Sequence, residues 1–256
     1  MQVTLDATRL KAIFFDMGGT LETLACDDAM RVVACEHILR VLRDAGIILP
    51  LAPIQFLDCV KSGLQRYIAS REITQRELPP ASVWRNYLLA QSVSSDERLA
   101  TVLDAIGEEL AFIWDLEGYR REMRPEVPAA LTTLRGLGLQ LGIISNVFSA
   151  HQVYHDLARF GIRGYFDPVI LSVSFGHRKP APMIFQHAAM LARVPVAACV
   201  YVGDSLFHDV AGAQHAGFAR AVWLDAPWAE KFSPNQPAIK PDLTIHTLSD
   251  LLELFG

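Results

Sequence analysis

The stretch that decides the fold of this 256-residue chain is AIFFDMGGTL, residues 12–21. The apolar run over residues 11–16 predicts a short buried strand, and Gly18 and Gly19 predict a tight turn directly after it. Asp16 therefore stands at the carboxyl end of this strand. In open α/β sheets, ligands bind in the crevice outside the carboxyl ends of the parallel strands. This aspartate is the first candidate for a functional residue.

The hundred residues after this stretch have the periodicity of helices, and no convincing strand is expected among them. Asp27 and Asp28 can begin the first helix, and Gly46 follows its end. The last helix opens with Ser94 and Glu97, which are spaced as a capping box. The helices are expected at residues 28–45, 53–70, 81–91 and 94–114.

From residue 125 onward, strands alternate with helices, which predicts a parallel sheet covered on both faces. The fold class is therefore α/β, a doubly wound, Rossmann-like core with an inserted all-helical domain. We expect the core at residues 1–21 and 125–256, and the helical domain at residues 22–124. An insert that leaves after the first strand would lie over the ligand crevice as a lid. Strands are expected at 139–144, 169–171, 199–202, 221–224 and 243–245, with helices at 127–136, 149–160, 182–192, 208–216 and 248–254.

The composition excludes several classes of protein. With 51% hydrophobic residues, the chain can bury a sizeable core. Its net charge is -5, and its 18 arginines and five lysines form no basic run, so no nucleic-acid partner is expected. The four cysteines lack the spacing of a zinc site or a disulfide scaffold. Without a signal peptide or a run of ~18 apolar residues, we expect a cytoplasmic protein that has no membrane partner.

Polar residues follow four of the predicted strands, either directly or in the next turn. In a parallel sheet, all of them would meet at one rim. Two of the carboxylates can hold Mg²⁺, which prefers oxygen ligands, and a lysine adds positive charge beside them. A serine with nearby backbone N–H groups can bind a phosphate group. The set supplies what phosphoryl transfer requires, and it consists of Asp16, Ser145 with Asn146, Lys179, and Asp204 with Asp209.

The order of these segments resembles that of the haloacid dehalogenase-like hydrolase superfamily. The segments are DMGGTL at 16–21, SN at 145–146, KP at 179–180 and GDSLFHDVAGA at 203–213. Together they cover nearly the whole chain, and four motifs in order are far more specific than one. The helical insert resembles the C1 cap of that superfamily. The resemblance implies a magnesium-dependent phosphatase or phosphotransferase, a phosphoric monoester hydrolase that acts on a small soluble phosphorylated substrate.

The resemblance also implies roles for single residues. Asp16 would be the nucleophile that forms an aspartyl-phosphate, with Lys179 as charge stabiliser and Ser145 as phosphate ligand. Asp209 would ligate magnesium through water, or orient Lys179 or Ser145. Implied substrate or phosphate ligands are Ser145, Asn146, Lys179 and Thr20, and implied magnesium ligands are Asp16, the carbonyl of Gly18, Asp204 and Asp209.

The sequence departs from the superfamily at Gly18. Phosphatases of the superfamily carry an aspartate there, which protonates the leaving group and then activates water. General acid/base catalysis contributes about 10²- to 10⁴-fold, so turnover is expected to be attenuated. Glu22 is a candidate substitute for the missing group, although a surface or hinge glutamate is the simpler interpretation.

Three other functions fit the same motifs. A phosphonate C–P hydrolase would need a Schiff-base lysine, and Lys61 is the only lysine in the insert. A 2-haloacid dehalogenase would also lack the second aspartate, but it needs no metal. A pseudo-phosphatase that only binds a ligand is the third alternative. The sequence does not indicate the oligomeric state or the identity of the substrate.

Overall fold

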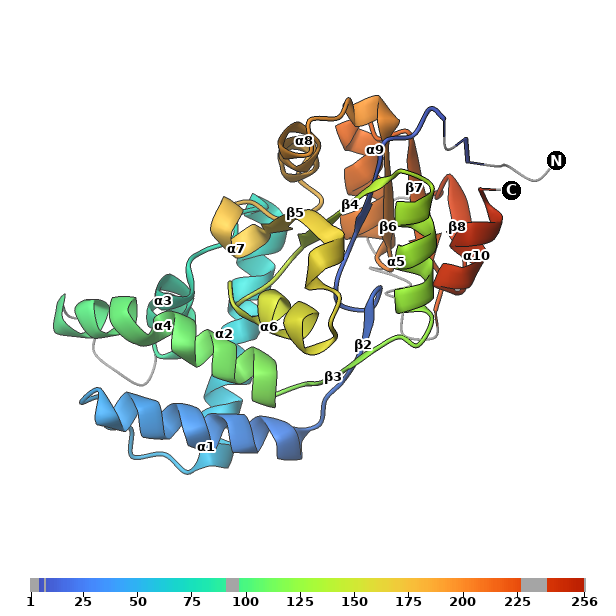
Figure 1. Ribbon diagram of the computed structural model, residues 1–256. Helices are drawn as coiled ribbons and strands as arrows, with labels where there is room; N and C mark the ends of the chain where they lie inside the picture. The colour runs from blue at the N-terminus through green and yellow to red at the C-terminus, as the bar shows by residue number, and fades with distance from the viewer. Residues whose placement is uncertain (1–4, 7, 91–96, 227–238, 256) are drawn as a thin grey trace. The chain divides into compact units, whose positions relative to one another are not determined.

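The structure is a computed structural model that describes residues 5–6, 8–90, 97–226 and 239–255. It divides into two compact units (Figure 1). One unit, the α/β unit, comprises Met1–Thr23, Glu122–Asn146 and Asp156–Gly256. The other, the helical unit, comprises Leu24–Arg121 and Val147–His155. Among the helices of the described residues, none is long and apolar enough to cross a membrane.

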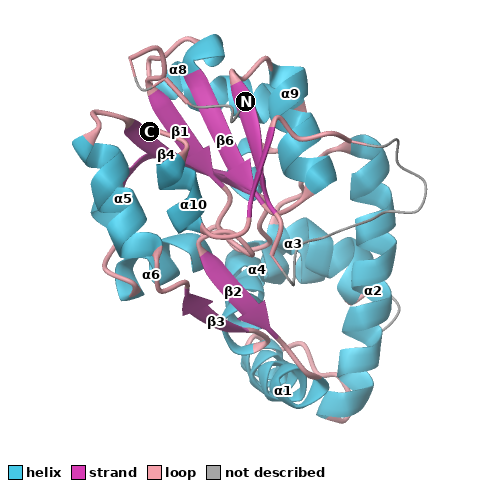
Figure 2. Cartoon of the chain, turned by 90° about the vertical axis from the view of Figure 1, so that its right-hand side faces the viewer, coloured by secondary structure: helices cyan, strands magenta, loops and turns pink. Residues whose placement is uncertain are grey.

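A six-stranded sheet forms the centre of the α/β unit, with the strand order β5-β4-β1-β6-β7-β8. All five neighbouring pairs are parallel, so the predicted parallel α/β fold is confirmed. The first strand lies between β4 and β6, which places its carboxyl end in the middle of the sheet (Figure 2). The strands are β1 (Ala12–Phe15), β4 (Gln140–Ser145), β5 (Phe166–Leu171), β6 (Cys199–Gly203), β7 (Arg220–Leu224) and β8 (Leu243–Ile245).

Helices cover both faces of this sheet. Alternate side chains of a strand point to opposite faces, and Ala12 and Phe14 of β1 share one core cluster with Ile184 and Ala213. These two residues belong to α8 (Pro182–Leu191) and α9 (Gly212–Ala216), which contact each other on that face. On the other face, α5 (Val127–Gly136) contacts β4 and α10 (Leu248–Glu253).

Three elements of the α/β unit differ from the sequence-based expectation. Strand β5 begins three residues earlier than expected, because the Asp167–Pro168 dipeptide interrupts its apolar pattern while Phe166 still pairs with Leu141. The helix expected at 208–216 is a π-helical turn, η4 (Leu206–Ala211), followed by α9. The helix expected at 149–160 is α6 (Gln152–Arg159). Further short elements are α7 (Ser172–Phe175) and the 3₁₀ turns Arg163–Tyr165 and Val196–Ala198.

The helical unit has its own hydrophobic core, built around Trp84, Phe56 and Tyr67. Asp27 caps its first helix by accepting the N–H of Met30. The helix expected at 81–91 divides into α3 and a π-helical turn, and the expected cap Ser94 lies outside the described residues. The elements are α1 (Asp28–Asp44), α2 (Pro53–Thr74), α3 (Pro80–Val83), η1 (Trp84–Leu88) and α4 (Glu97–Glu117).

Two short strands lie at the ends of the segment expected to be wholly helical. They are β2 (Glu22–Ala25) and β3 (Arg120–Met123), which pair as a separate two-stranded sheet. The expectation of no strand between residues 22 and 124 was therefore wrong. Neither tetrapeptide has a period-2 apolar pattern, and pairing between residues about a hundred positions apart cannot be seen in a local window.

The segment Val147–His155 belongs to the helical unit, although the sequence-based boundaries placed it in the core. Its attachment is polar and buried. The N–H of Ser149 donates to Oδ2 of Asp115 at 3.0 Å, and its hydroxyl donates to Oε1 of Glu108 at 2.6 Å. Phe148 packs against the helical core, with its ring 6.2 Å from that of Trp84. The chain therefore enters the helical unit twice, once for the helices and once for this segment.

Candidate active site

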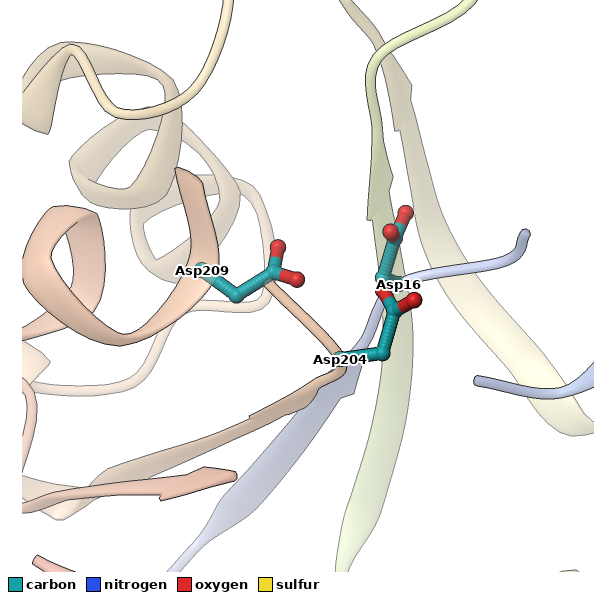
Figure 3. Close-up of side chains that lie close together, drawn as sticks. All are labelled: Asp16, Asp204 and Asp209. Atoms are coloured by element: carbon teal, nitrogen blue, oxygen red, sulfur yellow. The ribbon is translucent and has the colours of Figure 1, made fainter. Parts of the chain in front are cut away.

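Three aspartates gather at the carboxyl ends of the central strands (Figure 3). Asp16 follows β1, Asp204 follows β6, and Asp209 extends from η4 toward the other two. One ligand oxygen from each lies within 4.8 Å of the others. Adjacent parallel strands of one sheet end side by side, so residues 188 positions apart in sequence meet at this rim.

One oxygen of Asp16 is held by three donors. Its Oδ1 accepts the N–H of Met17 at 2.7 Å, the hydroxyl of Ser145 at 2.9 Å and the ammonium of Lys179 at 2.9 Å. No described residue donates a hydrogen bond to Oδ2. Burial raises the pKa of Asp16, while the charge of Lys179 opposes that rise. The carboxylate is thus fixed through one oxygen and open to a ligand through the other.

Lys179 lies at the centre of the site and is only 1% exposed. Its Nζ donates to Oδ1 of Asp16 at 2.9 Å, to Oδ1 of Asp209 at 2.6 Å and to the hydroxyl of Tyr201 at 2.8 Å. Burial alone would lower the pKa of this lysine, but the two carboxylates outweigh it and raise the pKa. The ammonium is therefore charged, and an acceptor of this chain lies in reach of each of its three N–H groups.

Tyr201 is a site residue that the sequence reasoning missed. It lies in β6, is fully buried, and donates its hydroxyl to the carbonyl of Ile144 at 2.8 Å. Burial raises its pKa well above the ordinary value, and the nearby carboxylates add to that effect, so the hydroxyl is neutral. One signal was available in the sequence, because a tyrosine inside an otherwise apolar strand requires a partner for its hydroxyl.

Asp204 is held by its backbone as well as by its surroundings. Nε1 of Trp223, in β7, donates to its carbonyl oxygen at 2.9 Å, a contact that could not be predicted from the sequence. Burial raises the pKa of Asp204 to about 8, with further contributions from Asp209 and Asp16. A second cation beside Lys179 would relieve this repulsion between the carboxylates.

The turn after Asp16 is built from small residues. Gly18 is partly buried and forms a bridge with Glu22, and the N–H of Gly19 donates to the carbonyl of Glu22 at 2.8 Å. Thr20, which the resemblance made a phosphate ligand, is fully buried, and no described residue bonds its hydroxyl. Its role as a phosphate ligand therefore stays a prediction.

Asn146 positions the third motif. Its amide nitrogen donates to the carbonyl of Lys179 at 3.0 Å, and its amide oxygen accepts the N–H of Lys179 at 2.8 Å. This pair of bonds joins the segment after β4 to the backbone of Lys179. Both groups of the Asn146 amide are thereby engaged, as is the hydroxyl proton of Ser145 on Asp16.

The donor set fits a hard divalent cation. Three carboxylates that converge within 4.8 Å offer oxygen ligands to Mg²⁺, and among the described residues Lys179 is the one lysine paired with them. Asp16 and Asp204 supply the open oxygens. Asp209 uses Oδ1 for Lys179 and Oδ2 for the N–H of Ser205, so its first task is to orient the lysine, one of the two roles left open by the sequence.

Two candidates from the sequence remain, Glu22 and Lys61. Glu22 begins β2 and is fully buried, so it is not the surface glutamate that the simpler interpretation assumed. Lys61 lies in α2 of the helical unit and makes an ion pair with Asp28 at 2.7 Å.

Comparisons with known proteins identify the family of the chain. A family model described as haloacid dehalogenase-like hydrolase matches residues 10–217. The glyceraldehyde 3-phosphate phosphatase of Pyrococcus abyssi is 34% identical over 218 residues, which are 84% of this chain and 81% of the relative. That of Methanopyrus kandleri is 33% identical over 130 residues, 51% of this chain and 55% of the relative. The chain spans about half the length of this and two other curated relatives that it matches.

A solved structure resembles the whole chain. It is a 2-haloacid dehalogenase from Pseudomonas syringae pv. Tomato DC3000, with a TM-score of 0.64 and 26% sequence identity. The match covers 96% of this chain and 97% of that one, so the two proteins share both the sheet and the helical unit in outline.

Proposed function

The chain belongs to the haloacid dehalogenase-like hydrolase family, and on that premise we propose that it is a magnesium-dependent phosphatase for a small phosphorylated substrate. The observation that carries the proposal is the surrounding of Asp16. Its carboxylate meets Lys179, Ser145 and two further aspartates at the end of the central strand. This set supplies a nucleophile, a fixed positive charge and a place for a metal ion.

The first chemical step forms a covalent intermediate. Oδ2 of Asp16, the oxygen without a donor among the described residues, attacks phosphorus while Oδ1 keeps the carboxylate oriented. The bond between phosphorus and the ester oxygen breaks, and its electron pair leaves with the alcohol. That oxygen takes a proton from solvent, because Gly18 offers no acid. Lys179 offsets the negative charge that spreads over the phosphoryl oxygens.

The second step regenerates the enzyme. Water attacks phosphorus of the aspartyl-phosphate and loses a proton to solvent. The bond to Asp16 breaks, its electron pair restores the carboxylate, and inorganic phosphate leaves. No aspartate at position 18 removes the proton of the attacking water, so this step limits turnover and proceeds about 10²- to 10⁴-fold below that of relatives with a general base.

Magnesium would be held by Asp16, Asp204 and the carbonyl of Gly18, with Asp209 contributing through water. When bound, it would neutralise the carboxylates and polarise the phosphoryl group toward attack. The support for this cofactor is the convergence of three carboxylates around a single lysine.

The proposal also covers the class of substrate, the role of the helical segment and the cellular compartment. Four curated relatives carry the name glyceraldehyde 3-phosphate phosphatase, which suggests a small sugar-like phosphate. Residues 22–124 would serve as the cap that closes over such a substrate and excludes water. All four cysteines are free, as suits the reducing cytoplasm.

The test is release of phosphate from p-nitrophenyl phosphate and a panel of small phosphate esters, with and without Mg²⁺. We expect activity that requires magnesium and that Asp16→Asn lowers by at least about 10³-fold, because the amide cannot act as nucleophile. The control is Asp167→Asn, an exposed aspartate of β5 in the same unit. Activity that survives in Asp16→Asn would overturn the assignment of the nucleophile.

A second candidate, 2-haloacid dehalogenase, is favoured by the overall likeness to the Pseudomonas syringae structure. In that reaction a carboxylate attacks carbon and displaces halide, and no metal is needed. Chloride release from 2-chloropropionate that persists in EDTA, together with no phosphate release from the panel, would replace the phosphatase proposal. Failure of both assays would move the ligand-binding and phosphonate alternatives to the front.

A further inference from the structure

We propose that Tyr201 is a positioning residue, whose hydroxyl holds Lys179 and the end of β4 in the arrangement that the reaction requires. The inference rests on the proposed function of the site. It concerns a residue of the sheet interior whose hydroxyl bonds Lys179 and the carbonyl of Ile144.

The direction of both hydrogen bonds of Tyr201 is fixed by its partners. The Nζ of Lys179 can only donate, so the hydroxyl accepts from it at 2.8 Å. The carbonyl of Ile144 can only accept, so the hydroxyl donates to it at 2.8 Å. One phenol therefore satisfies a donor of one motif and an acceptor of another, with no freedom to reverse.

The hydroxyl of Tyr201 is important because both of its partners lead to Asp16. Ile144 directly precedes Ser145, whose hydroxyl donates to Oδ1 of Asp16. Lys179 donates to that same oxygen. Two of the three donors on the nucleophile are thus connected through Tyr201, which spans from β6 to the end of β4.

The ring of Tyr201 is held separately from its hydroxyl. It packs at 5.0 Å from Phe185 and 6.4 Å from Phe218, both at edge-to-face angles. These contacts would survive in Tyr201→Phe, which removes only the oxygen. In that variant Lys179 loses one of three acceptors, while its two carboxylate partners, Asp16 and Asp209, remain. The ammonium is then free to shift between them.

The experiment compares steady-state kinetics of wild type, Tyr201→Phe and Tyr165→Phe with p-nitrophenyl phosphate. Tyr165→Phe removes a hydroxyl that bonds Thr132 at 2.8 Å in the same unit, and it serves as the matched control. For Tyr201→Phe we expect kcat to fall about 10- to 100-fold, since a misplacement of about 1 Å has that effect. KM should change less than about threefold, because the fixed charge acts mainly on the transition state.

Two outcomes overturn the proposal. One is a kcat of Tyr201→Phe within about threefold of wild type. The other is a fall of kcat accompanied by an equal rise of KM and a large loss of thermal stability, which would show a merely structural role. If wild type releases phosphate from no ester, the proposed function fails, and the crystal structure of Tyr201→Phe decides the inference by itself. Displacement of Nζ of Lys179 from Asp16 by about 1 Å supports it, and an unchanged position overturns it.

Discussion

At the scale of single residues, the proposed function makes Gly18 the residue that limits the rate of turnover. It stands two positions after the nucleophile, in the turn that Gly19 and Glu22 close by a backbone hydrogen bond. A carboxyl group at that position could protonate the leaving group and activate water. We expect Gly18→Asp to raise kcat for p-nitrophenyl phosphate tenfold or more, equal to about 1.4 kcal/mol of barrier.

The control for this gain is the double variant Asp16→Asn/Gly18→Asp. It should be inactive, because the new carboxyl group cannot replace the nucleophile. A rate for Gly18→Asp equal to that of wild type would show that another group already performs the acid/base work, and the buried Glu22 would be examined next.

Gly19 keeps the nucleophile's turn close to Asp204. Its φ is +79°, and a Cβ built there would lie 2.1 Å from Oδ2 of Asp204. Gly19→Ala should therefore displace that carboxylate and weaken magnesium binding, measured by calorimetry, by more than about tenfold.

The matched control is Gly138→Ala, at a φ of +81° with nothing within 4 Å of the added Cβ. It carries the same backbone strain, about 1 kcal/mol, without the contact. Equal magnesium affinity in the two variants would show that strain alone, and not the displaced Asp204, weakens the site.

How much of the site is readable from sequence depends on how each residue is held. Asp16 and Asp204 directly follow strands, Ser145 ends β4, and strand ends are visible as apolar runs that stop. Lys179 lies beyond α7 and was found by its motif. The structure brings these residues together. Tyr201 is different, because it reaches its partners across the face of the sheet. Such a contact depends on strand order, which no local window contains.

At the scale of elements, α4 carries a titrating group in the helical unit. Asp115 is buried, with 7% of its surface exposed, and burial raises its pKa from 3.8 to about 6. The native state binds this proton more tightly than the unfolded chain does. The stabilisation from the carboxyl group is thus complete below pH 4 and is lost as the pH rises through 6.

This loss of stability with rising pH gives a prediction for Asp115→Asn, which keeps an oxygen for the N–H of Ser149 but carries no charge. Between pH 4.5 and pH 7.5, the free energy of unfolding of the variant should rise by about 2 kcal/mol relative to that of wild type. Urea unfolding at the two pH values measures it, with the exposed Asp104→Asn on the same helix as control. A pH-independent difference between variant and wild type would contradict the assignment.

The elements that the sequence missed share one physical cause. Strands β2 and β3 receive their hydrogen bonds from each other across about a hundred residues, and neither has an apolar face of its own. The π-helical turns η1 and η4 keep the helical apolar pattern and differ only in their hydrogen-bond spacing. Periodicity finds elements that bury a face, and these four are defined by their backbone bonds.

At the scale of the whole molecule, the parallel sheet was the most predictable feature. Its five principal strands after β1 and the helices between them follow the expected alternation. The assignment of residues 147–155 to the helical unit was not predictable from sequence, because these residues follow a core strand and run directly into α6, which the unit boundary divides after His155. Their packing on Trp84 and their bonds to Glu108 and Asp115 assign them to the helical unit.

The helical unit is built from two separate stretches of the chain, and this has a consequence for the design of chimeras and for the evolution of such proteins. A graft that transplants residues 24–121 from a relative, joined at two points, would leave Phe148 and Ser149 facing a foreign surface. A working chimera would have to exchange both stretches at once, through four junctions. The helical unit is therefore harder to transfer between proteins than a single inserted segment. Substitutions in α4 and in residues 147–155 are expected to be correlated among relatives.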